Sequence, residues 1–112
     1  MSNCIDFEAF HSNYGNLVEI EKKIAMAFIG EASNMVGEFE AALASGDEKK
    51  IRFHSHTMKG ASANVFASPL VEGFKQIENY DGAHLLPFAR EKFTELKPAI
   101  EVALQELRDF LS

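Results

Sequence analysis

The sequence predicts an all-α protein made of a short N-terminal helix followed by four longer helices. Apolar residues recur at spacings of three and four through most of the 112 residues, as they do along the buried face of a helix. Clusters of Gly, Pro, Asn, Asp and Ser divide this pattern into separate segments, and no segment favours a strand. The length suits a single domain, residues 1–112, with one hydrophobic core.

The first two helices are predicted from their caps and their apolar stripes. A short helix begins at Asp6, a candidate N-cap, and ends near Gly15. A long helix then spans residues 16–45, with Asn16 as N-cap and Glu19 completing a capping box. Its core face is expected to comprise Leu17, Ile20, Ile24, Met26, Phe28, Ile29, Met35, Phe39 and Leu43.

The third helix is predicted over residues 47–66. Gly46 supplies a left-handed stop before it, and Asp47 places an acid at its positive end. Its buried stripe is expected to comprise Ile51, Ser55, Met58, Ser62 and Val65.

The last two helices are separated by a cluster of turn-forming residues that begins at Asn79. Ser68 as N-cap and Pro69 as first residue start the fourth helix, whose stripe is Leu70, Phe74 and Ile77. The fifth helix spans residues 85–111, and Pro98 should kink or interrupt it because the ring clashes with the carbonyl four residues earlier.

One histidine of the third helix is predicted to face solvent. At roughly 100° per residue, His56 lies roughly 140° from the centre of the buried stripe. Arg52 and Lys59 stand about one turn before and after it, and Gly60 and Ala63 leave little side-chain bulk beyond it. This pattern is typical of a histidine that a large partner reaches and that carries a negative group.

His54, two residues earlier, is the alternative reactive histidine. It lies about 160° from His56, on the flank of the apolar stripe, so we expect a partly buried and hydrogen-bonded residue. Two histidines at this spacing cannot bind one metal ion from the same helix, because that requires a separation of three or four residues.

The run from His56 to Val65, HTMKGASANV, resembles the signature of histidine-containing phosphotransfer (HPt) domains. The resemblance implies an antiparallel four-helix bundle, with the short helix as an extra element. It implies that His56 accepts a phosphoryl group from a receiver-domain aspartate, on a hybrid sensor kinase or a response regulator, and passes it to another receiver. Lys59 would then hold the phosphoryl oxygens, and Gly60 would leave room for the partner.

The resemblance extends weakly over the whole chain, with one departure. Where the family usually places Gly soon after the Asn of the motif, this chain has Phe66. Phe66 is expected on the apolar side of the helix end, so the departure predicts altered packing and unchanged chemistry.

A residue of the fourth helix is expected to orient the imidazole. The short link makes this helix antiparallel to the third, so its C-terminal half returns close to His56. Gln76 and Glu78 are both candidates to accept a hydrogen bond from the ring, which would leave the other nitrogen as nucleophile. The resemblance favours Glu78 and leaves Gln76 open.

The surface around His56 is the expected partner-binding face, and its residues are Arg52, Phe53, Gly60, Ala63 and Asn64. The resemblance implies that the partners are receiver domains, and that the Mg²⁺ required for transfer is bound by the receiver. The chain has no Gly-rich phosphate loop, so we expect a carrier with no cofactor and no kinase activity of its own.

The composition restricts the other partners. With 11 basic and 17 acidic residues the net charge is −6, which argues against nucleic acid and anionic membranes. No apolar run is long enough for a membrane span, and the single Cys4 indicates a reducing compartment. We expect a monomeric cytoplasmic protein; whether it is free-standing or a domain of a larger kinase is left open.

Two other functions remain as alternatives. The chain could be an HPt-like adaptor or inhibitor that binds a kinase or receiver through the same face without phosphotransfer, although such a protein would not need His56, Lys59 and Gly60. A metal-binding bundle would need inward-facing ligands, for which only His54 and His11 qualify.

Overall fold

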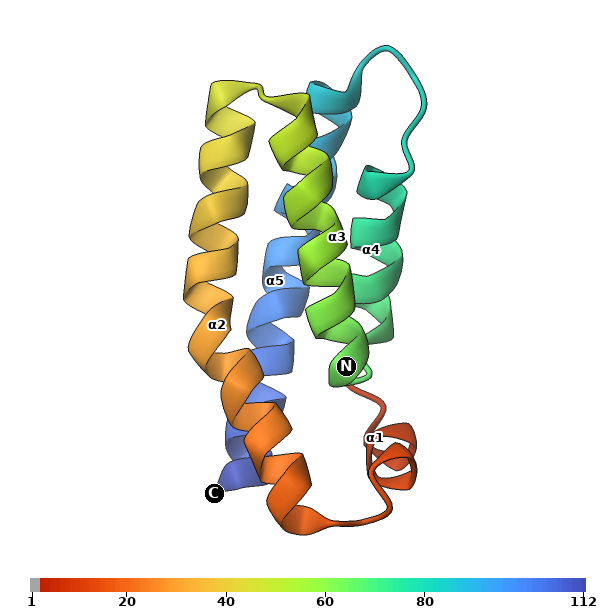
Figure 1. Ribbon diagram of the computed structural model, residues 1–112, viewed down its shortest axis with the longest axis vertical. Coiled ribbons are helices and arrows are strands. Elements are labelled where there is room, and N and C mark those ends of the chain that lie inside the picture. The colour runs from red at the N-terminus through yellow and green to blue at the C-terminus, as the bar shows by residue number, and fades with distance from the viewer. Residues whose placement is uncertain (1–2) are drawn as a thin grey trace.

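The computed structural model describes residues 3–112, and within this range the chain forms helices and no strand. The helices are α1 (Phe7–Asn13), α2 (Val18–Ser45), α3 (Glu48–Asn64), α4 (Ser68–Glu78) and α5 (Leu85–Leu111). In Figure 1, α2, α3, α4 and α5 stand side by side as an antiparallel bundle, while α1 lies at one end. The predicted fold class is confirmed. Within residues 3–112, none of these helices combines the length and hydropathy that crossing a membrane requires.

The predicted caps of α1 and α3 are confirmed. The Asp6 carboxylate accepts a hydrogen bond from the Ala9 N–H at 3.0 Å, and the Asp47 carboxylate accepts one from the Lys50 N–H at 3.1 Å. Gly46 ends α2 with a φ of 71°, a left-handed conformation that glycine adopts without steric cost. The chain therefore reverses sharply between α2 and α3, and α3 starts beside the end of α2.

The predicted cap of α2 is wrong. Leu17 is the N-cap residue and no side chain caps this end, so Asn16 and Glu19 form no capping box. Asn16 has a φ of 58° and follows Gly15, whose φ is 63°. These left-handed residues turn the chain between α1 and α2, and such a conformation differs from the extended one that an N-cap residue adopts.

The predicted cap of α4 is also wrong, by one residue. Ala67 is the N-cap residue, so Ser68 is already the first helical residue and its side chain makes no capping hydrogen bond. The backbone N–H of Ala67 donates to the Ser62 carbonyl at 3.0 Å. Because Ala67 is fully buried, the turn is fixed by backbone bonds and packing, and Pro69 follows in the first turn.

The core lies between α2, α3, α4 and α5 and is centred on three aromatic rings. The centroid of the Phe39 ring lies 4.6 Å from that of Phe93 and 5.7 Å from that of Phe74. The predicted stripes of α3 and α4 are buried, and they comprise Ile51, Ser55, Met58, Ser62 and Val65, with Leu70, Phe74 and Ile77. The buried hydroxyl of Ser55 donates to the Ile51 carbonyl at 2.8 Å, so it is satisfied. Burial of this stripe orients the opposite face of α3 toward solvent.

Part of the predicted core of α2 is wrong. Leu17, Ile20 and Met26 are exposed, whereas Phe28, Phe39 and Leu43 are buried as predicted. Met26 is two residues from the buried Phe28, which places it on the solvent side of α2. For Leu17 and Ile20 the reason is length: α2 has 28 residues and α3 has 17, about 42 Å against about 26 Å at the rise of a helix. The first turns of α2 therefore extend past the end of α3, as Figure 1 shows, and α3 does not cover them.

Pro98 does not interrupt α5, so the expectation of an interruption is wrong. The helix runs unbroken from Leu85 to Leu111 with Pro98 inside it. Pro98 is exposed, and the buried residues Phe93, Leu96 and Ile100 anchor the helix on both sides of it. A carbonyl left without a partner on a solvent-facing side can bond to water, which lowers the cost of an internal proline.

Phe66 follows α3 in a left-handed conformation, with a φ of 58°. This conformation suits glycine and costs other residues on the order of 1 kcal/mol. The ring of Phe66 lies edge-on to Tyr14 at 6.4 Å, and its carbonyl accepts the Asp6 N–H at 3.0 Å. Phe66 therefore packs at the junction of α1 with the end of α3, against the edge of the core.

A partly buried hydrogen bond between a histidine and a glutamate joins α1 to α2. The Nδ1 of His11 lies 2.9 Å from Oε1 of Glu21, whose side chain is only 1% exposed. The His11 ring contacts Phe7, Phe10 and Phe110 at 5.7 to 5.8 Å between centroids. This cluster places Phe7 and Phe10 over one end of the bundle.

Candidate functional site

His56 lies on the outward face of α3, opposite the buried stripe, as the sequence predicts. Its side chain is 66% exposed, although it stands in the middle of a helix whose other face is fully buried. His54 is half-buried and packs its ring against that of Phe53 at 5.3 Å. Of the two neighbouring histidines, His56 is therefore the one that a macromolecular partner can reach.

Glu78, the last residue of α4, is the group that contacts the imidazole. Its Oε2 lies 2.7 Å from Nδ1 of His56. Gln76, the other candidate, is exposed and does not make this contact. The antiparallel return of α4 brings together two residues that are 22 positions apart in the sequence.

Lys59 completes a three-residue cluster around the Glu78 carboxylate. Its Nζ lies 2.7 Å from Oε1 of Glu78, so one carboxylate contacts both His56 and Lys59. The bond from Lys59, and then that from His56, hold the pKa of Glu78 below its usual value, despite an opposing effect of burial. Glu78 is therefore ionised at neutral pH and can only accept hydrogen bonds.

The charge of Glu78 decides the tautomer of the imidazole. Because a carboxylate accepts, Nδ1 of His56 must carry the proton in the 2.7 Å hydrogen bond. In the neutral ring Nε2 is then unprotonated and keeps its lone pair. Within residues 3–112 no hydrogen bond engages Nε2, so the exposed edge of the ring is nucleophilic.

Arg52 lies one turn before His56 and points toward α4. Its Nη1 donates to the backbone carbonyl of Glu78 at 2.7 Å, and its side chain is half-buried. This basic group was expected to contact a partner, and its bond to α4 was not predicted. A signal was available, since a cation is favoured beside a helix C-terminus and α4 was expected to end near His56.

The other residues of the predicted partner-binding face are exposed. Phe53 is a large apolar side chain with 64% of its surface exposed. A Cβ added to Gly60 would meet no atom within 4 Å, so the space above the helix is open there. Ala63 and Asn64 continue this open strip toward the end of α3.

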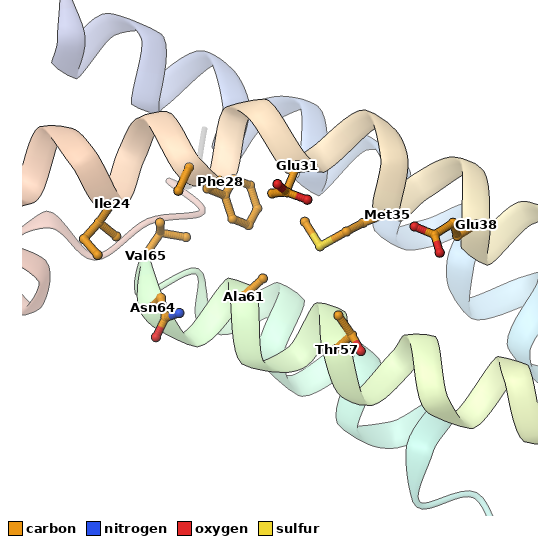
Figure 2. Close-up of a pocket in the computed structure, with 10 residues that line it drawn as sticks. Ile24, Phe28, Glu31, Met35, Glu38, Thr57, Ala61, Asn64 and Val65 are labelled. Atoms are coloured by element: carbon orange, nitrogen blue, oxygen red, sulfur yellow. The ribbon is translucent and has the colours of Figure 1, made fainter.

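A groove of about 360 Å³ runs beside this face, between α2 and α3. Figure 2 shows Glu31, Met35 and Glu38 of α2 on one side, across from Thr57 and Ala61 of α3 on the other. Thr57 is the neighbour of His56, so the groove and the strip of small residues adjoin. Met35 was expected in the core, whereas its side chain is only half-buried and lines this groove.

Residues 3–112 contain no group of three or more His, Cys, Asp and Glu residues that could hold a metal ion. His11 is occupied by Glu21, and His54 packs beside Phe53.

Comparison with known proteins gives one match. A family model described as the Hpt domain matches residues 23–110, which include α3 and α4 with the whole histidine cluster. No curated protein and no solved structure matches the chain significantly.

Proposed function

We propose that this protein, which belongs to the Hpt domain family, carries a phosphoryl group on His56 as an intermediate of a phosphorelay. Hpt domains take part in histidine phosphotransfer in two-component signalling. The observation that supports His56 as the carrier is its exposed ring, whose Nδ1 donates to the Glu78 carboxylate at 2.7 Å.

The chemistry requires an unprotonated nitrogen that faces the partner. Nε2 attacks the phosphorus of an aspartyl phosphate on a receiver domain, the P–N bond forms and the P–O bond to the aspartate breaks. The aspartate leaves as a carboxylate, and the ring becomes a phosphoimidazolium that keeps its proton on Nδ1. Glu78 stabilises this positive ring through the hydrogen bond that already exists. The reverse reaction transfers the group to the next receiver.

Lys59 is proposed to hold the phosphoryl oxygens. An ammonium group has three donors, and the ion pair with Glu78 uses one of them. The remaining donors can bind a phosphoryl group on the neighbouring Nε2. The positive charge of Lys59 would therefore be shared between Glu78 and the phosphoryl group.

We propose receiver domains as the partners, because their aspartyl phosphate supplies the group that His56 accepts. The receiver would bind the Mg²⁺ ion, and this chain would contribute position and charge, on which phosphoryl transfer mainly depends. The docking surface would comprise Phe53, Gly60, Ala63 and Asn64 with the adjoining groove. We place the protein in the cytoplasm as a monomer, in keeping with its single, buried and unpaired Cys4.

The test is to mix the protein with a phosphorylated receiver domain and to measure phosphate that is labile in acid and stable in base. We expect this phosphate in the wild type and in His54→Gln, and none in His56→Gln. Phosphate that persists in His56→Gln would contradict the assignment. An adaptor that uses the same face would bind the receiver in all three forms and take up no phosphate.

A further inference from the structure

We propose that Arg52 is a positioning residue, which holds the end of α4 so that the Glu78 carboxylate stays against His56. The sequence predicted Arg52 as a partner contact, and the structure turns its guanidinium inward. Only the kinetic consequence of this inference rests on the proposed function; the effect on the His56 ring does not.

Arg52 binds the C-terminal end of α4. The last carbonyls of a helix have no partner within the helix, and they form its negative end. α4 has 11 residues, ends at Glu78, and is followed by residues 79–84, which form no regular structure. The guanidinium of Arg52 donates to the Glu78 carbonyl at 2.7 Å, so a charged hydrogen bond fixes this last turn to α3.

Three side chains of α3 hold one residue of α4, Glu78. His56 and Lys59 contact the carboxylate of Glu78, and Arg52 contacts its backbone. The three stand at successive turns of α3 and so share one side of the helix. Since a displacement of the backbone moves the side chain with it, loss of the Arg52 bond would loosen both contacts of the carboxylate.

Arg52 and Lys59 act on different parts of Glu78. Lys59 and His56 lower the pKa of the Glu78 carboxyl, whereas Arg52 is not among the groups that shift it. Arg52 contacts the backbone carbonyl of Glu78 and not its carboxylate, so it contributes to the location of this residue. Arg52 is half-buried and its guanidinium is already bound to Glu78. It therefore presents less free surface to a docking partner than the exposed Phe53 does.

The direct test is the tautomer of His56, read from the ¹⁵N chemical shifts of its ring nitrogens in the full chain. We expect the Nδ1–H tautomer to dominate in the wild type. Arg52→Gln should raise the fraction of the Nε2–H tautomer, because the Gln side chain is too short to replace the guanidinium at the Glu78 carbonyl. Arg52→Lys should retain part of the Nδ1–H tautomer, because it keeps a cationic donor.

Arg90→Gln is a matched control. Arg90 donates to the Leu43 carbonyl at 3.1 Å, in the last turn of α2, so it makes the same kind of contact at another helix end. Loss of this contact should lower stability to a similar degree without changing the His56 tautomer. If Arg52→Gln leaves the tautomer as in the wild type, or if Arg90→Gln shifts it equally, the inference is overturned.

The kinetic test uses phosphoramidate, a small donor that needs no docking surface. Arg52→Gln should slow uptake on His56 by roughly threefold to tenfold, since misplacement of a reacting group reduces the rate to this order or more. In a Glu78→Ala background the same substitution should have no further effect, because the residue through which it acts is gone. If Arg52→Gln slows transfer only from a receiver and not from phosphoramidate, Arg52 is a docking residue and the inference is wrong. If the wild type accepts no phosphate from either donor, the proposed function fails, and the tautomer comparison still decides the role of Arg52.

Discussion

Residues 3–112 contain two histidine–glutamate pairs, one at each of two helix contacts, and they differ in burial. His11 of α1 lies 2.9 Å from Glu21 of α2, with side chains 36% and 1% exposed. His56 of α3 lies 2.7 Å from Glu78 of α4, with side chains 66% and 23% exposed. In both pairs Nδ1 is the bonded nitrogen, so the contact itself does not distinguish a structural histidine from a reactive one.

The surroundings of the two rings make the distinction. His11 is enclosed by three phenylalanine rings, and the second oxygen of its partner Glu21 is buried without a hydrogen bond within residues 3–112. His56 faces open space beside Gly60. The second oxygen of Glu78 also lacks a well-formed hydrogen bond within residues 3–112, but the Lys59 ammonium forms an ion pair with it at 2.7 Å. A buried carboxylate that depends on one imidazole makes that imidazole structural, whereas a carboxylate held by a lysine leaves the imidazole available for reaction.

The largest expected effect comes from removing each imidazole in turn. His56→Gln should reduce phosphate uptake from a receiver at least a hundredfold, because the nucleophile is gone, and should change the free energy of unfolding little. His11→Gln should leave uptake close to the wild-type rate and lower the free energy of unfolding by about 1–3 kcal/mol, because Glu21 then lacks its partner. Chemical denaturation and a transfer assay on both variants measure the two effects.

A contrary result would be equally clear. If His11→Gln reduced uptake while the protein remained folded, the pair at α1 would belong to the reactive site, and the contrast drawn from burial would be wrong.

The next effect concerns the open space above the reactive ring. Gly60→Leu should slow transfer from a receiver at least tenfold, because a large side chain would stand where the partner approaches. The rate with phosphoramidate should stay near that of the wild type. Stability should rise by up to about 1 kcal/mol, since glycine disfavours a helix interior.

Gly37→Leu is the control for this substitution. Gly37 lies on α2, borders a hollow lined by α5 residues such as Ile100, and also has no atom within 4 Å of an added Cβ. It should gain similar stability without any loss of transfer. Equal losses in both variants would show that the docking surface is not the face around His56.

The same contrast explains what the sequence could predict. Periodicity placed the buried stripe of α3, and the orientation of His56 followed from it, because both depend on the 3.6-residue repeat alone. The short link before α4 then indicated that Glu78 or Gln76 would come near the ring. These are local patterns, and the structure agrees with them.

The predictions that were missed or wrong mostly concern contacts between segments far apart in the sequence. Two contacts were not predicted, the His11–Glu21 pair and the bond from Arg52 to the Glu78 carbonyl, and each joins separate helices. The exposure of Leu17 and Ile20 depends on how far α2 extends past α3, which an apolar stripe does not reveal. The caps of α2 and α4 failed because backbone turns replaced side-chain capping.

A smaller effect is expected at Phe66, on the structural side of the contrast. Phe66→Ala keeps a side chain in the left-handed conformation and removes the ring that packs on Tyr14, so it should destabilise the fold by about 1–2 kcal/mol. Phe66→Gly loses the same ring but relieves the backbone, so its stability should lie within about 1 kcal/mol of the wild type. Thermal unfolding measures both, and transfer rates should not change. A transfer defect in a folded Phe66→Gly would contradict the prediction of altered packing with unchanged chemistry.

The smallest expected effect is the pH dependence of the reactive pair. The pKa of Glu78 is lower in the fold than its ordinary 4.5, chiefly because of Lys59 and then His56. Ionised Glu78 therefore stabilises the fold at pH values above 4.5, and this contribution is lost as the pH falls below 4.5 through the lowered value. For a pair this close to solvent, the contribution of ionised Glu78 should stay below about 1 kcal/mol.

The measurement is the difference in unfolding free energy between the wild type and Glu78→Gln from pH 6 down to about pH 3, which should shrink on acidification. Lys59→Met should remove more of this pH-dependent difference than His56→Gln does, because Lys59 is the larger cause of the shift. The reverse order would mean that the imidazole, and not the lysine, keeps Glu78 ionised, and the reactive pair would then resemble the buried one at α1.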